Sequence, residues 1–127
     1  MKRDMKKLYS SVTGIDQGSV QLFSDFEDGG EMWSGQGDRE RWMPVEFSET
    51  FKSVPAVFIS LQLLDLHSGA NHRTVIVAEN ITQTGFDAVL RTWGDTRIAR
   101  ATAAWMAIGE VKGDEDWDID YGSQGGS

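Results

Sequence analysis

The sequence predicts an all-β fold, a six-stranded antiparallel β-sandwich. Six short segments show the two-residue alternation of apolar and polar side chains that is typical of strands, and Val, Ile, Phe, Thr and Trp are enriched in them. Turn-forming residues separate most of these segments. No helical pattern of useful length lies between them, so crossover helices and a parallel sheet are not expected. The 127 residues suit one domain with its own core.

A Gly-rich loop and several short turns connect the predicted strands. Residues 29–37 form the loop, between the first and second strands. Pro44 lies in the second strand and has no amide hydrogen for a sheet ladder, so this strand should be an edge strand. The six strands are expected over residues 19–26, 43–47, 57–63, 73–79, 86–93 and 102–111.

The two ends of the chain differ from the predicted sandwich, which spans residues 19–111. Residues 1–18 are an N-terminal arm or attachment segment, in which Met5, Leu8, Tyr9 and Val12 have helical spacing. A short amphipathic helix and a loosely ordered arm are both compatible with this pattern, because so short a helix is marginal alone. Residues 112–127 are acidic and rich in Gly and Ser, which predicts a flexible tail.

Composition and charge argue against several classes of protein. The chain has no cysteine, which excludes disulfides and thiolate chemistry, and its net charge of −8 argues against nucleic-acid binding. No apolar stretch approaches the roughly 20 residues of a membrane helix, and no apolar run follows the charged start as in a secretory signal. We expect no membrane insertion and no cofactor, and a location in the cytoplasm or in a released, virion-like particle.

The connection between the fourth and fifth strands predicts their register. If the turn centres near Gln83, with Gly85 as a left-handed residue, Arg73 faces Trp93 across the two strands. Both side chains then lie on the less apolar face of the sheet. This pair is either a cation–π strut or a binding platform. The other face is the better core and carries Thr74, Ile76, Ala78, Phe86, Ala88 and Leu90.

A series of short motifs runs from Val45 to Gly109. They are Val45-Glu46-Phe47, Phe51, Pro55-Ala56-Val57, Leu61-Gln62-Leu63-Leu64-Asp65, Asn71-His72-Arg73, Asn80-Ile81-Thr82-Gln83-Thr84-Gly85-Phe86, Thr92-Trp93-Gly94-Asp95-Thr96 and Ala104-Trp105-Met106-Ala107-Ile108-Gly109. In order and spacing they resemble the H-type lectin domain, the family of the snail agglutinins and of the C-terminal part of the discoidins. The resemblance implies a six-stranded sandwich that forms a homotrimer. It also implies sugar sites near protomer boundaries that prefer N-acetylgalactosamine or galactose.

The same resemblance suggests which residues contact sugar. The matching motifs assign sugar contacts to Arg73 and Trp93, the pair that the hairpin register already sets side by side. The family also uses an acidic residue from the earlier loop. An ungapped match puts Gln36 there and a small shift puts Asp38 there, and Asp38 is favoured because a carboxylate accepts stronger hydroxyl bonds. Asp95 suits a turn or a bond to a sugar hydroxyl.

Some positions depart from the family pattern. The residue after the site tryptophan is often polar in the family but is Gly94 here, and a site aromatic residue of the snail proteins falls near Ala99 or Arg100. These departures leave open a loss of the sugar site. Two tryptophans have open roles: Trp33 either lines the site or caps the sandwich, and Trp105 is either core or trimer interface.

Enzyme and metal chemistry are not expected. Asp25, Glu27 and Asp28 are close in sequence, but they lie in a hydrophilic, Gly-bounded stretch rather than in the pattern of a glycosidase carboxylate pair. His72 is a strand-end or interface residue rather than a ligand. The acidic tail lacks the Gly and terminal Glu of a calcium loop.

Three functions remain. The first is a carbohydrate-binding module for galactose-type cell-surface glycans. The second is the spike or fibre head of a phage or phage-like particle, joined to the particle through residues 1–18. The third is a trimeric assembly domain that has lost its sugar site.

Overall fold

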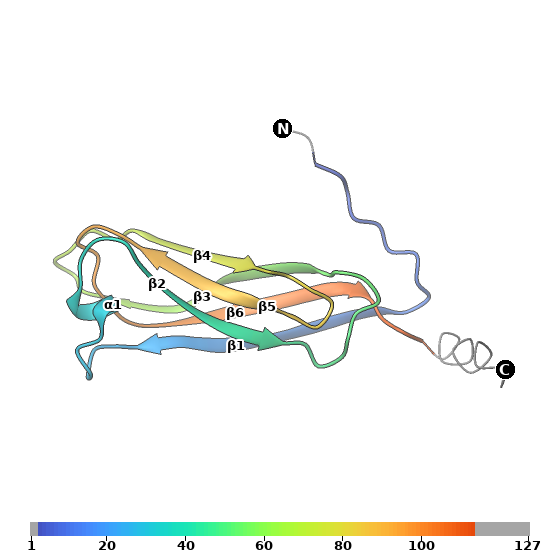
Figure 1. The fold of residues 1–127 in the computed structure, drawn as a ribbon, viewed down its shortest axis with the longest axis horizontal. Helices are drawn as coiled ribbons and strands as arrows, with labels where there is room; N and C mark the ends of the chain where they lie inside the picture. The colour runs from blue at the N-terminus through green and yellow to red at the C-terminus, as the bar shows by residue number, and fades with distance from the viewer. Residues whose placement is uncertain (1–2, 114–127) are drawn as a thin grey trace.

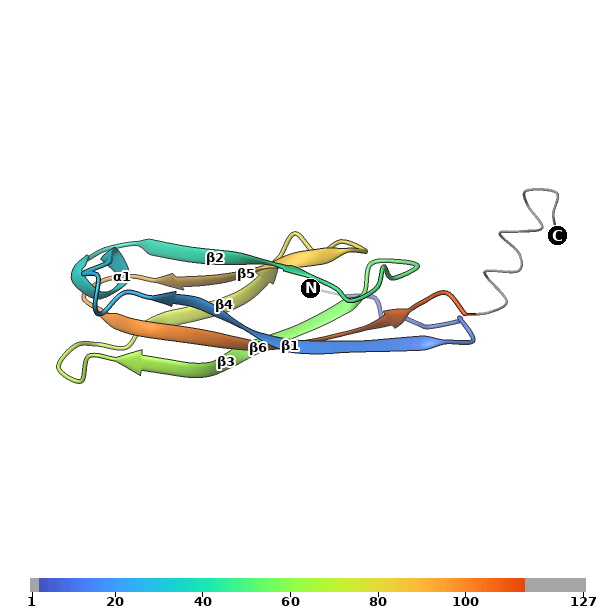
Figure 2. The same cartoon turned by 90° about the horizontal axis from the view of Figure 1, so that it is seen from below.

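The computed structural model describes residues 3–113 and shows two antiparallel sheets packed face to face (Figures 1 and 2). One sheet has the order β1-β6-β3 and the other the order β2-β5-β4. One helical turn, α1 (Glu31–Ser34), lies between β1 and β2. The predicted all-β, six-stranded antiparallel sandwich is therefore confirmed. The strands are β1 (Thr13–Ser24), β2 (Arg39–Glu46), β3 (Ala56–Leu66), β4 (Thr74–Glu79), β5 (Gly85–Thr92) and β6 (Ile98–Glu110).

Strand β1 begins at Thr13, six residues before the expected start, and residues 5–12 form no helix. Residues 13–18 contain two glycines, so local propensity favours a loop. Pairing with β6 overrides that propensity, because the ladder runs from Thr13 opposite Glu110 to Ser24 opposite Arg100. Of the predicted tail, residues 114–127 lie outside the described residues.

The core lies between the two sheets and is centred on aromatic rings. Phe47, Phe86 and Trp105 pack together, with ring centroids 5.5–5.9 Å apart. Of the two roles considered for Trp105, the structure shows the core. The central strand β6 carries small inward residues opposite the aromatic ones, so the sheets can approach closely. These small residues are Ala101, Ala103 and Ala107.

The β4–β5 hairpin has the predicted register, but its turn differs in detail. Val75 pairs with Arg91, and Glu79 pairs with Asp87. The left-handed residue is Asn80, with φ 53°, and not Gly85 as expected. Glycine is needed at position 85 for another reason, because a Cβ there would clash with the carbonyl oxygen of Val45. Pro44 lies on β2, which is an edge strand as predicted.

The N-terminal arm leaves the sandwich at the end opposite α1 (Figure 1). The Lys6 ammonium donates to the Val54 carbonyl oxygen at 2.7 Å. The Glu110 carboxylate accepts bonds from the amides of Tyr9 and Ser10, at 2.8 and 2.5 Å. The arm is thus fastened to the rim of the sandwich just before β1 begins.

Candidate functional site

Three candidate residues meet at the α1 end of the β2-β5-β4 sheet. Arg39 pairs with Thr92, and Thr74 pairs with Thr92 from the other side. Asp38, Trp93 and Arg73 lie one residue beyond the paired ends of β2, β5 and β4. If the alternation of the strands continues by one residue, the three form a row at the end of the outer face. The row carries a carboxylate, an indole and a guanidinium, which is the arrangement that the hairpin register predicted for Arg73 and Trp93.

A shallow depression of about 500 Å³ lies on this face. Asp38 and Trp93 line one side of it, and Trp93 is 40% exposed. The rest of the depression is lined by Arg39 and Thr92 and by the next row of the sheet, Glu40, Arg91 and Val75. Arg73 is not one of the lining residues. An open depression with an aromatic surface and several fixed polar groups suits a hydrophilic ligand with an apolar ring face.

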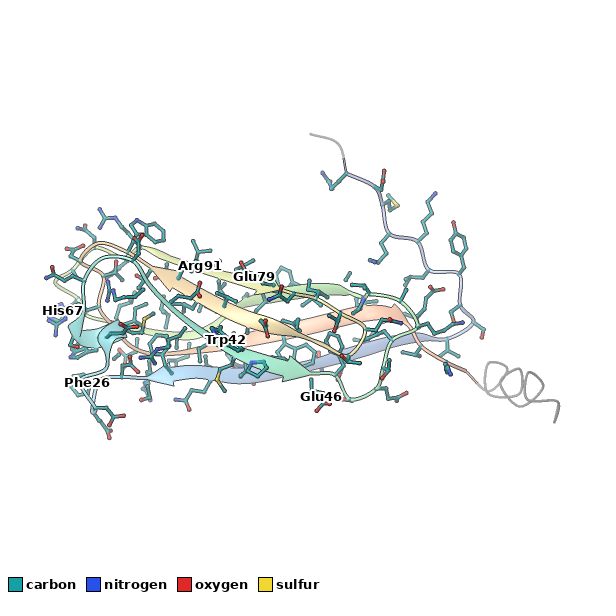
Figure 3. The ribbon with its side chains drawn as sticks, in the orientation of Figure 1. Phe26, Trp42, Glu46, His67, Glu79 and Arg91 are labelled. Atoms are coloured by element: carbon teal, nitrogen blue, oxygen red, sulfur yellow. The ribbon has the colours of Figure 1, made fainter. Side chains whose placement is uncertain are left out.

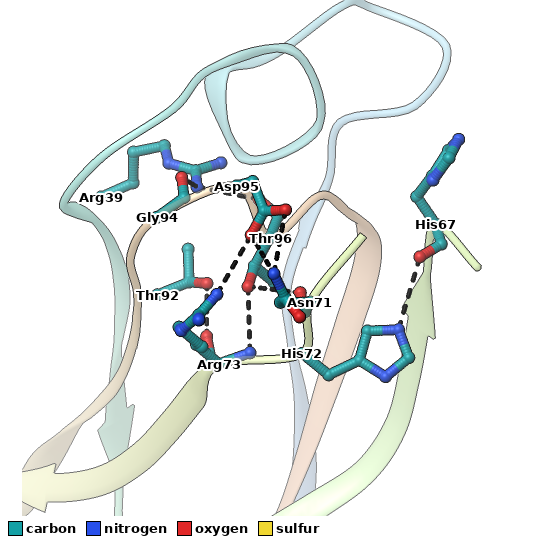
Figure 4. Close-up of polar contacts among 9 residues, drawn as sticks. All are labelled: Arg39, His67, Asn71, His72, Arg73, Thr92, Gly94, Asp95 and Thr96. Atoms are coloured by element: carbon teal, nitrogen blue, oxygen red, sulfur yellow. Dashed lines mark hydrogen bonds and ion pairs between the residues drawn. The ribbon is translucent and has the colours of Figure 1, made fainter. Parts of the chain in front are cut away.

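Arg73 is held beside the depression by Asp95. Its Nη1 atom donates to Asp95 Oδ1 at 3.1 Å, and both side chains are exposed. Asn71 Nδ2 donates to both Asp95 oxygens at 3.2 Å (Figure 4). The hydrogen bonds from Asn71, and secondarily the charge of Arg73, lower the pKa of Asp95. Arg73 pairs with Asp95, and the cation–π contacts within residues 3–113 join Arg41 to Phe23 and Arg97 to Trp33 rather than Arg73 to Trp93. The strut interpretation is therefore wrong.

Two buried threonines fix the backbone that presents Arg73. Thr96 Oγ1 accepts a bond from the Arg73 amide at 2.9 Å and donates to the Asn71 carbonyl oxygen at 2.6 Å. Thr92 Oγ1 donates to the Arg73 carbonyl oxygen at 2.5 Å. Both hydroxyls are almost fully buried, so these bonds are protected from water. Arg73 therefore has a defined position even though its guanidinium reaches solvent (Figure 4).

Arg39 connects the loops on either side of the depression. It is only 6% exposed, and its hydrogen-bond partners are backbone carbonyl oxygens. Its guanidinium donates to Glu31, Met32 and Gly37 on one loop, at 2.9–3.3 Å, and to Gly94 and Thr96 on the other, at 3.2 and 2.8 Å. Sequence reasoning missed this residue. The alternation of inward residues in β2, extended back from Phe47, would have turned Arg39 toward the interior.

Two glycines complete the junction between these loops. Gly37 and Gly94 have φ of 78° and 70°, a left-handed conformation that is costly for other residues. The Gly37 amide donates to the Gly94 carbonyl oxygen at 2.9 Å. Gln36 lies in the same loop and is exposed, but it does not line the depression, whereas Asp38 does. Of the two candidates for the acidic position, the structure thus places Asp38 at the depression and Gln36 outside it.

The other side chains considered lie away from the depression. Trp33 packs against Phe26, His67 and Arg97 at the end of the sandwich, so it has the capping role that was one of its two alternatives. His72 Nε2 lies 3.4 Å from the His67 carbonyl oxygen. Trp33 and His72 are therefore part of the end of the fold rather than of the row formed by Asp38, Trp93 and Arg73.

The carboxylates weighed for a glycosidase do not form a catalytic pair. Asp25 is buried, makes a two-pronged ion pair with Arg41 at 2.9 and 3.0 Å, and accepts the Met32 amide at 3.0 Å. Glu27 and Asp28 are exposed on the following turn. Asp25 is thus a structural group that anchors α1.

Within residues 3–113, no cluster of three or more His, Asp or Glu side chains could hold a metal ion. In the same part of the chain, no helix has the length and apolar character needed to span a bilayer.

The sandwich and its open, polar and aromatic site define a lectin-type domain. The sequence model of the H-type lectin domain matches residues 42–108. The chain belongs to the H-type lectin domain family.

Relatives of known sequence and structure agree with this assignment. The chain is 53% identical to "ATP synthase subunits region ORF 7" of Fuscovulum blasticum, over 91% of this chain and 100% of that protein. It is 36% identical to discoidin-2 of Dictyostelium discoideum, over 59% of this chain and 30% of that protein. The solved structure of recombinant discoidin II from the same organism superimposes with a TM-score of 0.67 at 30% identity, over 79% of this chain and 38% of that one. The chain thus spans about a third of the discoidins.

Proposed function

We propose that this chain is a carbohydrate-binding module that holds a galactose- or N-acetylgalactosamine-type sugar in the depression beside Trp93. The observation that carries the proposal is the row of Asp38, Trp93 and Arg73 on an open face of the β2-β5-β4 sheet. Membership of the H-type lectin family supports it.

Each residue of the row has a separate task in this proposal. Trp93 offers a flat apolar surface to the C–H face of the sugar ring. Asp38 accepts bonds from hydroxyl groups, and Arg73 donates to a hydroxyl or ring oxygen. Asp95 holds the Arg73 guanidinium and keeps spare acceptor capacity of its own. A shallow site of this kind binds a single sugar at about millimolar strength.

A glycan array followed by calorimetry tests the proposal. Arg73→Ala and Trp93→Ala should each weaken binding to the best glycan by about tenfold or more. Asp38→Asn should weaken it as well, whereas Gln36→Ala should not, which separates the two candidates for the acidic position. Tyr9→Ala removes an exposed aromatic residue elsewhere and serves as the matched control. Unchanged affinity in the Arg73 and Trp93 variants would contradict the proposal.

The module is proposed to act as a homotrimer, and the outer face of the β1-β6-β3 sheet supports this. Phe58 and Met106 pair across β3 and β6, and Ile15 pairs with Ile108 across β1 and β6. Phe58 is 71% and Ile15 is 66% exposed, which is unusual for side chains that form one contiguous stripe. Three sugar sites in one trimer would raise the effective affinity of a weak sugar contact through multivalency. Light scattering that gives a monomer at all practical concentrations would contradict the trimer.

A spike or fibre head that attaches a virus-like particle to a cell-surface polysaccharide is the second candidate. It is favoured by the arm, which leaves the sandwich at the end opposite the candidate site (Figure 1). In this proposal the chain is assembled into a released particle and the arm contacts that particle. Since β1 begins at Thr13, a truncation should remove only residues 1–11. Co-sedimentation of the truncated chain with particles from its host, at the level of the full chain, would count against the attachment role.

A trimeric assembly domain without a working site is the third candidate. Gly94 favours it, because a polar side chain is absent beside Trp93, and Ala99 is buried rather than at the depression. The same array decides between the candidates. A folded trimer that binds no glycan on the array would support the assembly domain over the lectin.

A further inference from the structure

A second exposed tryptophan lies on the same face as the candidate site. Trp42 is on β2, two residues beyond Glu40, and is 54% exposed. Side chains alternate along a strand, so Trp42 and Glu40 point to the same outer face. Figure 3 shows Trp42 and Arg91 on this sheet. Trp42 lies outside the row of Asp38, Trp93 and Arg73, and nothing in the proposed single-sugar site uses it.

The register fixes how far Trp42 is from Trp93. Trp42 pairs with Val89 on β5, and Val89 is four residues before Trp93. At a rise of about 3.3 Å per residue, the two tryptophans are attached about 13 Å apart along the sheet. This span is longer than one pyranose ring, so a ligand that contacts both indoles has several sugar units.

The surface between the two tryptophans is polar and fixed. Arg91 and Glu40 lie there, and the Arg91 Nε atom donates to Glu40 at 2.7 Å. The Arg91 Nη atoms donate at 2.9 and 3.1 Å to Glu79, which pairs with Asp87 one row beyond Trp42. These bonds from Arg91 lower the pKa of Glu79, which keeps its carboxylate ionised. A carboxylate has about four acceptor sites, so Glu40 and Glu79 retain capacity for hydroxyl donors.

The charge of the face indicates which glycans it takes. The outward carboxylates of Asp38, Glu40, Glu79, Asp87 and Asp95 outnumber the guanidiniums of Arg73 and Arg91. Both arginines are already paired with carboxylates. An acidic saccharide would meet net repulsion here, whereas a neutral one would not.

We propose that the outer face of β2-β5-β4 is an extended site for an uncharged oligosaccharide, in which Trp42 stacks on a sugar unit distant from the one held at Trp93. This inference rests on the proposed sugar-binding function and specifies the class of ligand, an uncharged oligosaccharide. The terminal sugar contacts Trp93, the middle of the chain crosses Arg91 and Glu40, and a further unit covers the exposed part of Trp42.

Calorimetry with matched saccharides tests the extended site. The probes are galactose, an uncharged tetrasaccharide that ends in galactose, and the same tetrasaccharide with one uronic acid unit. The wild-type chain should bind the neutral tetrasaccharide about tenfold tighter than galactose, on the scale of an aromatic contact, and the acidic one less tightly than the neutral one. Trp42→Ala should remove most of that gain and leave galactose affinity within about twofold.

Two further variants make the result specific. Trp42→Phe keeps a ring and should retain part of the gain, and Tyr9→Ala removes an exposed ring at the far end and should change nothing. Unchanged galactose affinity shows that each variant is folded. The extended site is overturned if Trp42→Ala leaves tetrasaccharide affinity intact or weakens both neutral probes equally. Failure of the wild-type chain to bind either neutral probe overturns the proposed function itself.

Discussion

The two sheets have similar inner faces and very different outer faces. On the β1-β6-β3 sheet, Ile15, Phe58 and Met106 are exposed and contiguous, and the ion pair of Arg100 with Asp65 lies toward one end. On the β2-β5-β4 sheet, charged groups separate the exposed tryptophans, because the ion pair of Arg91 with Glu40 lies between Trp93 and Trp42.

This difference teaches how one small sandwich can serve two kinds of contact. An exposed apolar stripe that is bordered by uncharged side chains such as Gln17 and Ser60 is best covered by a protein surface that excludes water. A mixture of indoles and ionised groups would leave charges unpaired under such a surface, but it matches a ligand with alternating hydroxyl and C–H groups. The apolar face is therefore suited to assembly and the mixed face to sugar.

The largest expected effect is on assembly. Phe58→Lys replaces about 1.5–3 kcal/mol of apolar burial per side chain with a charge that cannot be buried alone. Since the change recurs in every protomer, the proposed trimer should dissociate to monomers, measured by light scattering over a dilution series. Trp42→Lys makes the same kind of change on the opposite face and should leave the assembly intact. Dissociation by Trp42→Lys and not by Phe58→Lys would reverse the assignment of the two faces.

The next effect separates two arginines of the β2-β5-β4 sheet. Arg39→Met leaves the carbonyl oxygens of Met32, Gly37 and Thr96 without the guanidinium, which should cost about 3 kcal/mol of unfolding free energy. Arg91→Met removes exposed ion pairs, so its cost in unfolding free energy should be much smaller than that of Arg39→Met. Urea denaturation at one fixed protein concentration measures both. Equal losses would mean that Arg39 is not the connection between the loops.

A smaller effect is expected at Gly94, whose carbonyl oxygen joins its loop to the loop of Gly37. Gly94→Ala forces a side chain into a left-handed conformation at a cost of about 1–2 kcal/mol. The new Cβ would lie 3.4 Å from Arg73 Nη1, which is an ordinary van der Waals contact, so the cost should come from the backbone conformation. Gly94→Asn should cost less, because Asn tolerates this conformation better. If Ala and Asn cost the same, backbone conformation is not what selects glycine here.

The sequence correctly predicted the strands whose own residues show the two-residue alternation of apolar and polar side chains. The alternation around Ile76 and Leu90 was sufficient for the hairpin register, and with it for the pairing of Arg73 and Trp93. The alternation was insufficient where pairing with a distant strand determines the structure. The first six residues of β1 contain two glycines and form a strand because they pair with β6. Local propensity does not contain that information.

The candidate site was predictable in part for the same reason. Arg73, Trp93 and Asp38 were predicted from short motifs and from the two-residue alternation of strands. All three lie at one end of the sheet. The strut between Arg73 and Trp93 was a wrong alternative, because Asp95 approaches from a turn whose geometry the period does not describe. Arg39 was missed because a buried arginine paired only with carbonyl oxygens has no composition signal.

The smallest expected effect concerns pH and the polar side of the site. The pKa of Asp95 is lowered from its usual 3.8, so its contribution to stability is complete above that value and is lost as pH falls through the lower, folded-state pKa. Neither stability nor the Arg73 contact should respond to Asp95 between about pH 5 and 8. Because the Asn71 hydrogen bonds are the largest cause of the shift, Asn71→Ala should raise the pKa of Asp95 more than Arg73→Ala does. An NMR titration of the Asp95 carboxyl carbon measures both variants. A larger rise with Arg73→Ala would mean that the ion pair, and not the amide of Asn71, holds this carboxylate in place for sugar.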